Sequence, residues 1–252
     1  MRYFEKRNIS ERYDKYRPQV HRDIIQKLLE LASCKIKFQH VADIACGTGH
    51  STRPLLDYSE NVSGTDISQE MLNIAKERDP QVSYYLTPAE DLPFADSSLD
   101  AIFVCMALHW FDQEKFLSEV RRTLKSGGWL FIYNMWFPGQ MIENSRYTDW
   151  HTKEYWAKYP NPKRHTTPLK KLLENNDKIE FVGSHLLDIL VDFDSLELRN
   201  YLMTQSNIDA AIDKGHSAES VEGWIDDGVK PFFNTENEQF IYSCELSYAK
   251  CI

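Results

Sequence analysis

Residues 41–52 have the sequence VADIACGTGHST, in which an apolar run leads into two glycines, Gly47 and Gly49, separated by one residue. A strand that ends in a tight glycine turn lets a ligand approach the backbone at the end of the strand. A dinucleotide fingerprint requires a third glycine where this chain has Thr52, and a phosphate-binding P-loop requires a lysine that does not follow here. The turn therefore predicts a ligand site that matches neither nucleotide signature.

The chain on both sides of this turn alternates between segments of strand and helix character. Ser68 and Asp112 are expected to cap two helices, the second of which should end at Gly127 and Gly128. Buried strands are expected at 40–45, 61–68, 81–86, 98–108 and 129–135, and helices also at 19–33 and 50–59. Such alternation is typical of an α/β protein with a doubly wound parallel sheet.

The sequence pattern changes after Met135. Residues 136–176 are rich in aromatic residues, Pro and Lys, which predicts an inserted helical lid. A later strand is expected at 185–193, a capped helix at 195–203 and an edge strand at 238–252. We expect one domain over 1–252, made of an N-terminal helical segment at 1–37, a core at 38–135, the lid at 136–176 and closing strands and helix at 177–252.

Composition limits the classes of function. The chain has 252 residues, 42% of them hydrophobic and 27% charged, as in ordinary globular domains. Its net charge of −9 argues against a protein that mainly binds nucleic acid. The charged start of the chain and the lack of an apolar run of about 20 residues predict a cytoplasmic protein without a membrane span. The dispersed cysteines predict reduced thiols; they are Cys34, Cys46, Cys105, Cys244 and Cys251.

Four loops are expected to meet where the parallel strands end. Asp43 and the glycine turn form the first, Asp66 ends the second, and the segments 87–94 and 105–111 supply the others. A carboxylate at the end of the second strand can accept both hydroxyls of a ribose. Without the third glycine, this predicts a nucleoside that lacks a pyrophosphate, with an amino-acid tail held by the glycines and an ammonium held by Asp43. S-adenosylmethionine is the common nucleoside of that shape.

Four motifs resemble, in order and spacing, those of class I S-adenosylmethionine-dependent methyltransferases of the methyltransferase-11 type. They are VADIACGTGHST (41–52), GTDIS (64–68), AEDLPFADSSLDAIFVCMALHWF (89–111) and RTLKSGGWLFIY (122–133). The resemblance implies a Rossmann-like sheet of seven strands, mostly parallel with an antiparallel last strand, and a helical lid inserted after the fifth strand. YDKYRP (13–18) and ALHWF (107–111) are similar to the trans-aconitate-methyltransferase-like branch, which acts on small molecules.

The resemblance also implies which residues contact the cofactor. They are Tyr16, Arg17, Asp43, Ala45, Gly47, Gly49, Asp66, Ile67, Met71, Ala89, Glu90 and Met106. Many relatives carry an acidic residue where this chain has Pro88, so recognition of adenine must depend on Glu90 and the backbone of Ala89. Two of these acids could have a structural role in place of a cofactor contact, since Glu90 could cap a helix and Asp43 could accept hydrogen bonds from the amides of its own turn. No metal is expected.

The acceptor side is expected to include Tyr13, His109, Trp110, Trp136 and Gln205. His109 is the candidate general base, which an amine, phenol or alcohol would need and an ionised carboxylate would not. The leading hypothesis is O-methylation of a small carboxylate metabolite that a cation orients. The candidate cations are Arg17, Arg146 and Arg199. The other aromatic residues of the lid (Tyr147, Trp150 and Trp156) are expected to form its own core, and 163–165 a solvated loop.

Several alternatives remain open at this point. The methyltransferase of biotin synthesis, which acts on a malonyl carrier protein, resembles the core nearly as well, although it usually has Gln in place of His109. The chain could instead modify tRNA, hold the cofactor without catalysis or, as the least favoured alternative, act as a dehydrogenase. The expected partner is a small-molecule substrate, and the expected state is a monomer or weak dimer.

Overall fold

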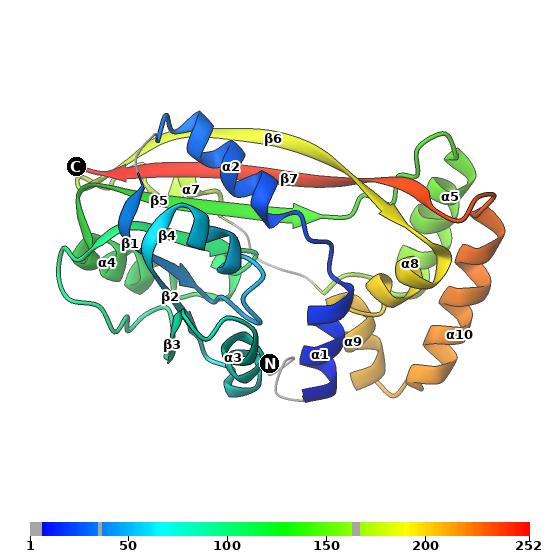
Figure 1. The fold of residues 1–252 in the computed structure, drawn as a ribbon. Helices are drawn as coiled ribbons and strands as arrows, with labels where there is room; N and C mark the ends of the chain where they lie inside the picture. Colours follow the sequence, from blue (N-terminus) through cyan, green and yellow to red (C-terminus); the bar gives the residue numbers. More distant parts are fainter. Residues whose placement is uncertain (1–6, 35–36, 163–166) are drawn as a thin grey trace. The chain divides into compact units, whose positions relative to one another are not determined.

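The structure is a computed structural model that describes residues 7–34, 37–162 and 167–252 (Figure 1). The loop expected at 163–165 lies outside the described residues. The chain divides into two compact units. The first, called the sheet unit here, comprises Gln19–Met135, His165–Leu187 and Cys244–Ile252. The second, called the aromatic unit, comprises Met1–Pro18, Trp136–Arg164 and Asp188–Ser243.

The strands form one mixed sheet of seven strands in the order β3-β2-β1-β4-β5-β7-β6 (Figure 1). Their bounds are β1 Phe38–Ile44, β2 Ser59–Asp66, β3 Ser83–Leu86, β4 Leu99–Cys105, β5 Leu124–Trp136, β6 Ile179–Phe193 and β7 Glu238–Cys251. Strands β1 to β5 pair in parallel, and β7 is antiparallel. The strand order reverses between β1 and β4, which is where such sheets bind ligands. The expected fold class is confirmed.

One strand takes a different place from the one expected. The alternating pattern of 238–252 predicted an edge strand, but β7 lies between β5 and β6 in the sheet. Its inward residues are fully buried, as Phe240, Cys244 and Leu246 show. A strand with one apolar face looks the same in sequence at an edge or inside a sheet, because pairing uses only the backbone. The edge is β6, on which Leu186 is 70% exposed.

The helices of the sheet unit are α2 His21–Leu31, η1 Arg53–Asp57, α3 Gln69–Arg78, η2 Leu108–Trp110, α4 Gln113–Thr123 and α7 Leu169–Leu172. Two of them, α3 and α4, begin directly after their expected caps, whereas α2 and η1 begin two and three residues later than expected and η2 and α7 were not predicted as separate helices. Ser68 and Asp112 accept hydrogen bonds from the amides of Met71 and Lys115, as N-caps do. However, α4 ends at Thr123 and not at the glycines. Leu124 already pairs with Leu99, and Gly127, with φ of 78°, lies in the irregular stretch before Trp129 pairs with Ala101.

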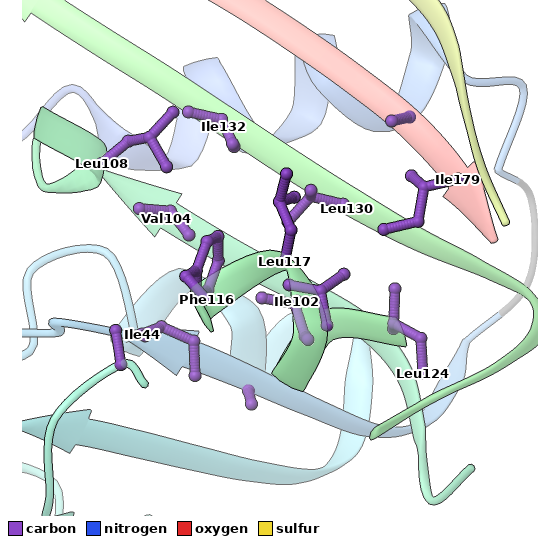
Figure 2. Packing of buried hydrophobic residues seen from close by; sticks show 14 of the residues in the cluster. Ile44, Ile102, Val104, Leu108, Phe116, Leu117, Leu124, Leu130, Ile132 and Ile179 are labelled. Atoms are coloured by element: carbon purple, nitrogen blue, oxygen red, sulfur yellow. The ribbon is translucent and has the colours of Figure 1, made fainter. Parts of the chain in front are cut away.

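A buried apolar cluster packs the sheet against α4 (Figure 2). Phe116 and Leu117 of α4 point toward Ile102, Leu130 and Ile132 of strands β4 and β5. These residues are 0 to 6% exposed. Burial of each large apolar side chain contributes about 1.5–3 kcal/mol to folding, so this cluster fixes the strands whose ends carry the polar residues described below.

The aromatic unit is mainly helical. Its helices are α1 Arg7–Tyr16, α5 Ser145–Trp150, the π-helix η3 His151–Tyr155, α6 Trp156–Lys158, α8 Ser195–Leu202, α9 Ser206–Asp213, α10 Ala218–Val229 and η4 Lys230–Phe232. The cap of α8 is Asp194, which forms a capping box with Glu197. Tyr147 and Trp150 are buried, as expected for a core of aromatic residues, whereas Trp136 is 45% exposed. Helices α9 and α10 were not expected from the sequence.

Candidate cofactor site

The glycine turn follows β1 directly and has an unusual backbone. Ala45, Gly47 and Gly49 have φ angles of 59°, 55° and 85°, in the left-handed region that favours glycine. A Cβ atom on Gly49 would also lie 3.0 Å from the hydroxyl oxygen of Tyr84. The turn is held to β2 by a hydrogen bond from the Cys46 amide to the Thr65 carbonyl, 2.9 Å long. Glycine at position 49 is therefore required by both the backbone and the space around it.

Asp43 is a fully buried carboxylate beside this turn. Its Oδ2 atom accepts hydrogen bonds from the hydroxyls of Ser51 (2.7 Å) and Thr52 (2.6 Å). Its Oδ1 atom is buried and has no hydrogen-bond partner among the described residues. Burial raises the pKa of Asp43 to about 7, and the nearby charge of Asp66 adds to the shift. A buried acceptor without a partner is costly, so the arrangement suits a bound cation such as an ammonium group.

Asp66, the last residue of β2, is held in place by backbone amides. Its Oδ2 atom accepts a hydrogen bond from Gly47 N (2.9 Å), and its Oδ1 atom accepts one from Ser68 N (2.8 Å). Burial raises the pKa of this carboxyl group, while the amides of Ser68, Gly47 and Ile67 oppose the shift. An ionised carboxylate has about four acceptor positions, so it can accept from a further donor beside these amides. This is the placement that a ribose-binding acid would need, and the ribose contact stays a prediction.

The segment expected to face adenine connects β3 to β4. Ala89 is 6% exposed, and Glu90 uses its Oε1 atom to accept a hydrogen bond from the Asp112 amide at 2.6 Å. The Glu90 side chain therefore ties this segment to the start of α4, which is the capping alternative considered for it. Its contact with adenine stays a prediction. Pro88, where many relatives have an acid, is exposed.

Three apolar residues from the expected cofactor set lie at strand ends or beside the turn. Ile67, directly after Asp66, is 76% exposed. Met71 is buried, and its sulfur would be 4.0 Å from a Cβ placed on Gly47. Met106 follows β4 with φ of 57°, and its sulfur accepts a hydrogen bond from Met135 N. An exposed isoleucine is the kind of surface that a purine ring can cover, and the contact of Ile67 with the cofactor stays a prediction.

His109 and Trp110 lie on η2, just beyond the end of β4. Their ring centroids are 4.8 Å apart, and Trp110 is 53% exposed whereas His109 is half-buried. Both residues therefore follow the strand end at which the strand order reverses. A role toward substrate stays a prediction for each of them.

Sequence reasoning missed a chain of polar side chains in the sheet unit. His21 and His50 are 7% and 5% exposed, and their ring centroids are 6.0 Å apart. His21 Nδ1 is 3.0 Å from the hydroxyl of Tyr133, and His50 Nδ1 is 2.7 Å from Nε2 of Gln19. The available signal was weak: a histidine directly after the glycine turn, and another at the start of a helix.

The remaining expected site residues belong to the aromatic unit. Arg17 donates a hydrogen bond to the Thr204 carbonyl (2.8 Å), and its guanidinium lies 4.8 Å and 5.5 Å from the ring centroids of Tyr13 and Tyr201. Tyr16 is half-buried at the end of α1. Gln205 accepts a hydrogen bond from the hydroxyl of Tyr155 (3.1 Å). The unit therefore brings Tyr13 and Arg17 into contact, and Gln205 contacts a different tyrosine.

The three candidate arginines differ in their surroundings. Arg146 is exposed. Arg199 forms an ion pair with Glu222, with Nη1 and Oε1 3.1 Å apart. Arg17 lies against two aromatic rings. A cation in contact with aromatic faces is less strongly hydrated than an exposed one, so Arg17 differs from the exposed Arg146 and the ion-paired Arg199.

Comparisons with known proteins agree with this geometry. Residues 42–132 match the family model described as a methyltransferase domain. A Dictyostelium discoideum protein named as a methyltransferase is 28% identical over 199 residues, which cover 70% of this chain and 74% of the relative. A Saccharomyces cerevisiae protein named as an S-adenosylmethionine-dependent methyltransferase is 26% identical over 217 residues, which cover 81% of this chain and 70% of the relative. For several other curated relatives, the matched residues span less than half of the relative's length, for example 46% and 45%.

A solved methyltransferase structure from Anaeromyxobacter dehalogenans has the same fold, with a TM-score of 0.72 and 20% identity over 91% of this chain and 95% of that one. The matched segment holds Asp43, the glycine turn, Asp66 and the strand ends described above. The chain is thus an S-adenosylmethionine-dependent methyltransferase with the class I fold. No helix among the described residues is long and apolar enough to cross a membrane.

S-adenosylmethionine fits the residues that are present. The unpartnered Oδ1 atom of Asp43 suits the ammonium of its amino-acid tail, and the bare backbone at Gly47 and Gly49 allows that tail to approach closely. Asp66 has acceptor positions left for ribose hydroxyls. When bound, the cofactor supplies a methyl group on a positively charged sulfur.

Proposed function

We propose that this methyltransferase transfers the methyl group to a carboxylate oxygen of a small metabolite, as in the trans-aconitate-methyltransferase-like branch that its motifs resemble. A carboxylate is ionised at neutral pH and can attack the methyl group in line without a base. The leaving thioether is neutral, so the contribution required of the protein is alignment and exclusion of water. Alignment of this kind can supply about 7 kcal/mol or more.

The observation that carries the proposal is the position of Arg17. Its guanidinium contacts the faces of Tyr13 and Tyr201, and the planar fork of a guanidinium matches the geometry of a carboxylate. Tyr13, Trp136 and Gln205 are proposed as further contacts to the acceptor, together with His109 and Trp110. Arg17 was also expected to contact the cofactor, and the experiment below separates the two roles.

The experiment is a screen of small acids with methyl-labelled cofactor, followed by mild alkali. Methyl esters release labelled methanol under alkali, whereas N-methyl, C-methyl and ether products do not. Arg17→Lys should raise the KM for the acid about tenfold or more and leave the KM for the cofactor nearly unchanged. The exposed Arg146 provides the matched control, because Arg146→Lys should change neither constant. Alkali-stable label on every product would refute the carboxylate proposal, and a changed cofactor KM would place Arg17 on the cofactor side.

A further inference from the structure

His151 is the first residue of the π-helix in the aromatic unit, and its side chain is fully buried. Its ring stacks on the ring of Tyr155 with centroids 5.0 Å apart, and the ring of Tyr147 lies at 5.9 Å in a similar plane. Phe137 and Trp156 meet the imidazole edge to face, both with centroids at 5.5 Å. The imidazole is therefore enclosed by four aromatic rings, which are called the His151 cluster here.

Neither nitrogen of this imidazole has a hydrogen-bond partner among the described residues. A Cβ atom on Gly139 would overlap Nδ1 of His151, so the backbone of Gly139 lies directly against this edge of the ring. A neutral imidazole carries one N–H group and becomes a cation when its other nitrogen takes a proton. A charge in an apolar enclosure costs far more free energy than a neutral ring, so the cluster favours the neutral form of His151.

No charged group among the described residues offsets this cost. The titratable side chains that face the ring are the phenols of Tyr147 and Tyr155, and burial raises the pKa of both, so they stay neutral. The neighbours from the loop before α5 and from α6 do not titrate. On the same helix, Asp149 and Lys153 pair with each other in solvent, with Oδ1 and Nζ 2.7 Å apart. Burial alone lowers the pKa of His151 from 6.5 to about 4.

The helix that carries His151 contains a turn with an alternative hydrogen-bond pairing. The helix runs without a break through α5, the π-helix and α6. The His151 carbonyl accepts from the amide of Trp156, five residues further on, as in a π-helix. An α-helical turn would use the amide of Tyr155 instead. A shift to that pairing rotates the two halves of the helix relative to each other by about 100°, the angle of one residue. The ring can therefore leave the cluster without unfolding of the whole helix.

We propose that His151 is an acid-sensitive switch of the aromatic unit: when its ring takes a second proton, the ring leaves the cluster and the turn 151–155 opens. The released ring is hydrated and titrates as an ordinary histidine, at 6.5. The closed turn is therefore fully favoured above pH 6.5. Its equilibrium constant falls by up to tenfold per pH unit between 6.5 and about 4.

Opening of this turn also affects a second part of the aromatic unit. Nδ2 of Asn207, at the start of α9, lies 3.1 Å from the phenol oxygen of Tyr155 in the same turn. Opening separates these two atoms, so the start of α9 loses its contact with the π-helix. The switch acts on the fold of this unit and is independent of the acceptor proposed above.

The test is hydrogen–deuterium exchange of the full chain, read by mass spectrometry in the peptide that covers residues 145–158. Exchange at pH 7.5 and 4.5 is compared after correction for the intrinsic pH dependence of amide exchange. The protection factor of this peptide should fall on the order of fiftyfold in the wild type. His151→Phe and His151→Met cannot take the proton, so their protection should change less than threefold. The flexible Met side chain adapts to the space where the larger Phe is too bulky.

Two controls separate the switch from general effects of acid. His216 is an exposed histidine of the same unit, so His216→Gln should leave the wild-type fall in protection intact. A peptide from α4 reports on the sheet unit and should keep its protection at pH 4.5. An equal fall in the wild type and in His151→Met would show that another group titrates. A fall of the same size in the α4 peptide would show unfolding of the whole chain, and unchanged protection in the wild type would show that acid does not open the turn. Each of these three results overturns the proposal.

Discussion

Arg53 binds both carboxylate oxygens of Asp79. Its Nε atom lies 3.1 Å from Oδ1 and 3.0 Å from Oδ2, and its Nη2 atom lies 2.9 Å from Oδ2. Asp79 caps the end of α3, while the Arg53 amide donates to the carbonyl of Gly49. The pair thereby links the glycine turn to the helix that follows Asp66.

We expect Asp79→Asn to lower the free energy of unfolding by about 2 kcal/mol. The side chain of Asp79 is only 7% exposed, but that of Arg53 is 33% exposed, so the loss should be smaller than for a fully buried pair. Urea denaturation would measure it. Asp96→Asn is the control, because Asp96 pairs with Arg122 from a side chain that is 79% exposed and should cost little. A similar loss for both variants would contradict the structural role of the Arg53–Asp79 pair.

Asp66→Asn should weaken the binding of S-adenosylhomocysteine by a factor of ten or more. The asparagine side chain has one accepting oxygen where the carboxylate has two. It therefore cannot accept from the backbone amides of Gly47 and Ser68 and also from ribose hydroxyls. Isothermal titration of the variant beside the wild type gives the result directly. Unaltered affinity would remove Asp66 from the cofactor site while leaving its role in fixing the turn.

The raised pKa of Asp43 predicts a pH dependence. Its pKa is 3.8 ordinarily and about 7 in the folded protein, so the folded state binds this proton more tightly. Without ligand, Asp43 therefore lowers the free energy of unfolding as pH rises from about 4 to 7. Above pH 7 its contribution no longer changes with pH. An ammonium ligand favours the ionised form. S-adenosylhomocysteine should consequently bind up to tenfold more weakly per pH unit below 7.

Two controls accompany the pH measurement. 5′-Methylthioadenosine lacks the amino-acid tail, so its affinity should vary little over the same pH range. Asp43→Asn should flatten the profile for S-adenosylhomocysteine. A wild-type profile that is already flat would show that Asp43 does not meet the ammonium.

Gly49→Ala should destabilise the protein more than Gly215→Ala. Both glycines have positive φ, of 85° and 102°, so both variants suffer backbone strain of about 1–2 kcal/mol. A Cβ at Gly49 would in addition lie 3.0 Å from the Tyr84 hydroxyl, whereas nothing lies within 4 Å of a Cβ at Gly215. Thermal unfolding of the two variants would separate strain from crowding, and Tyr84→Phe should recover part of the difference.

His109→Ala should leave the turnover of a carboxylate acceptor within about twofold of the wild type, since an ionised nucleophile needs no base. A loss of a hundredfold or more, with the acidic limb of the pH profile changed, would instead indicate a neutral acceptor and a catalytic His109. The measurement is kcat against pH for the acid identified by the screen.

The sequence was most informative where a chemical motif coincides with a local pattern of apolar and polar residues. Asp66 could be placed at the end of a strand because GTDIS combines a buried run with a polar end. The position of β7 could not be predicted, because its alternation of buried and exposed residues is the same inside a sheet and at its edge. The contact between His21 and Tyr133 was equally inaccessible, since the two residues are 112 positions apart and only the pairing of the strands brings them together. The early end of α4 depends on a strand pairing, between Leu99 and Leu124, that helix propensity does not contain.

The aromatic unit is assembled from three separated stretches of chain, and this has a consequence for synthesis. Arg17 reaches its partner at Thr204 across 187 residues, whereas strands β1 to β5 are complete once residue 136 has been made. On a ribosome, α1 therefore emerges before the other described elements and waits longest among them for its contacts, with its aromatic residues exposed while the central strands already pair. We expect chains arrested before residue 188 to hold a paired sheet and a first helix that proteases still cleave.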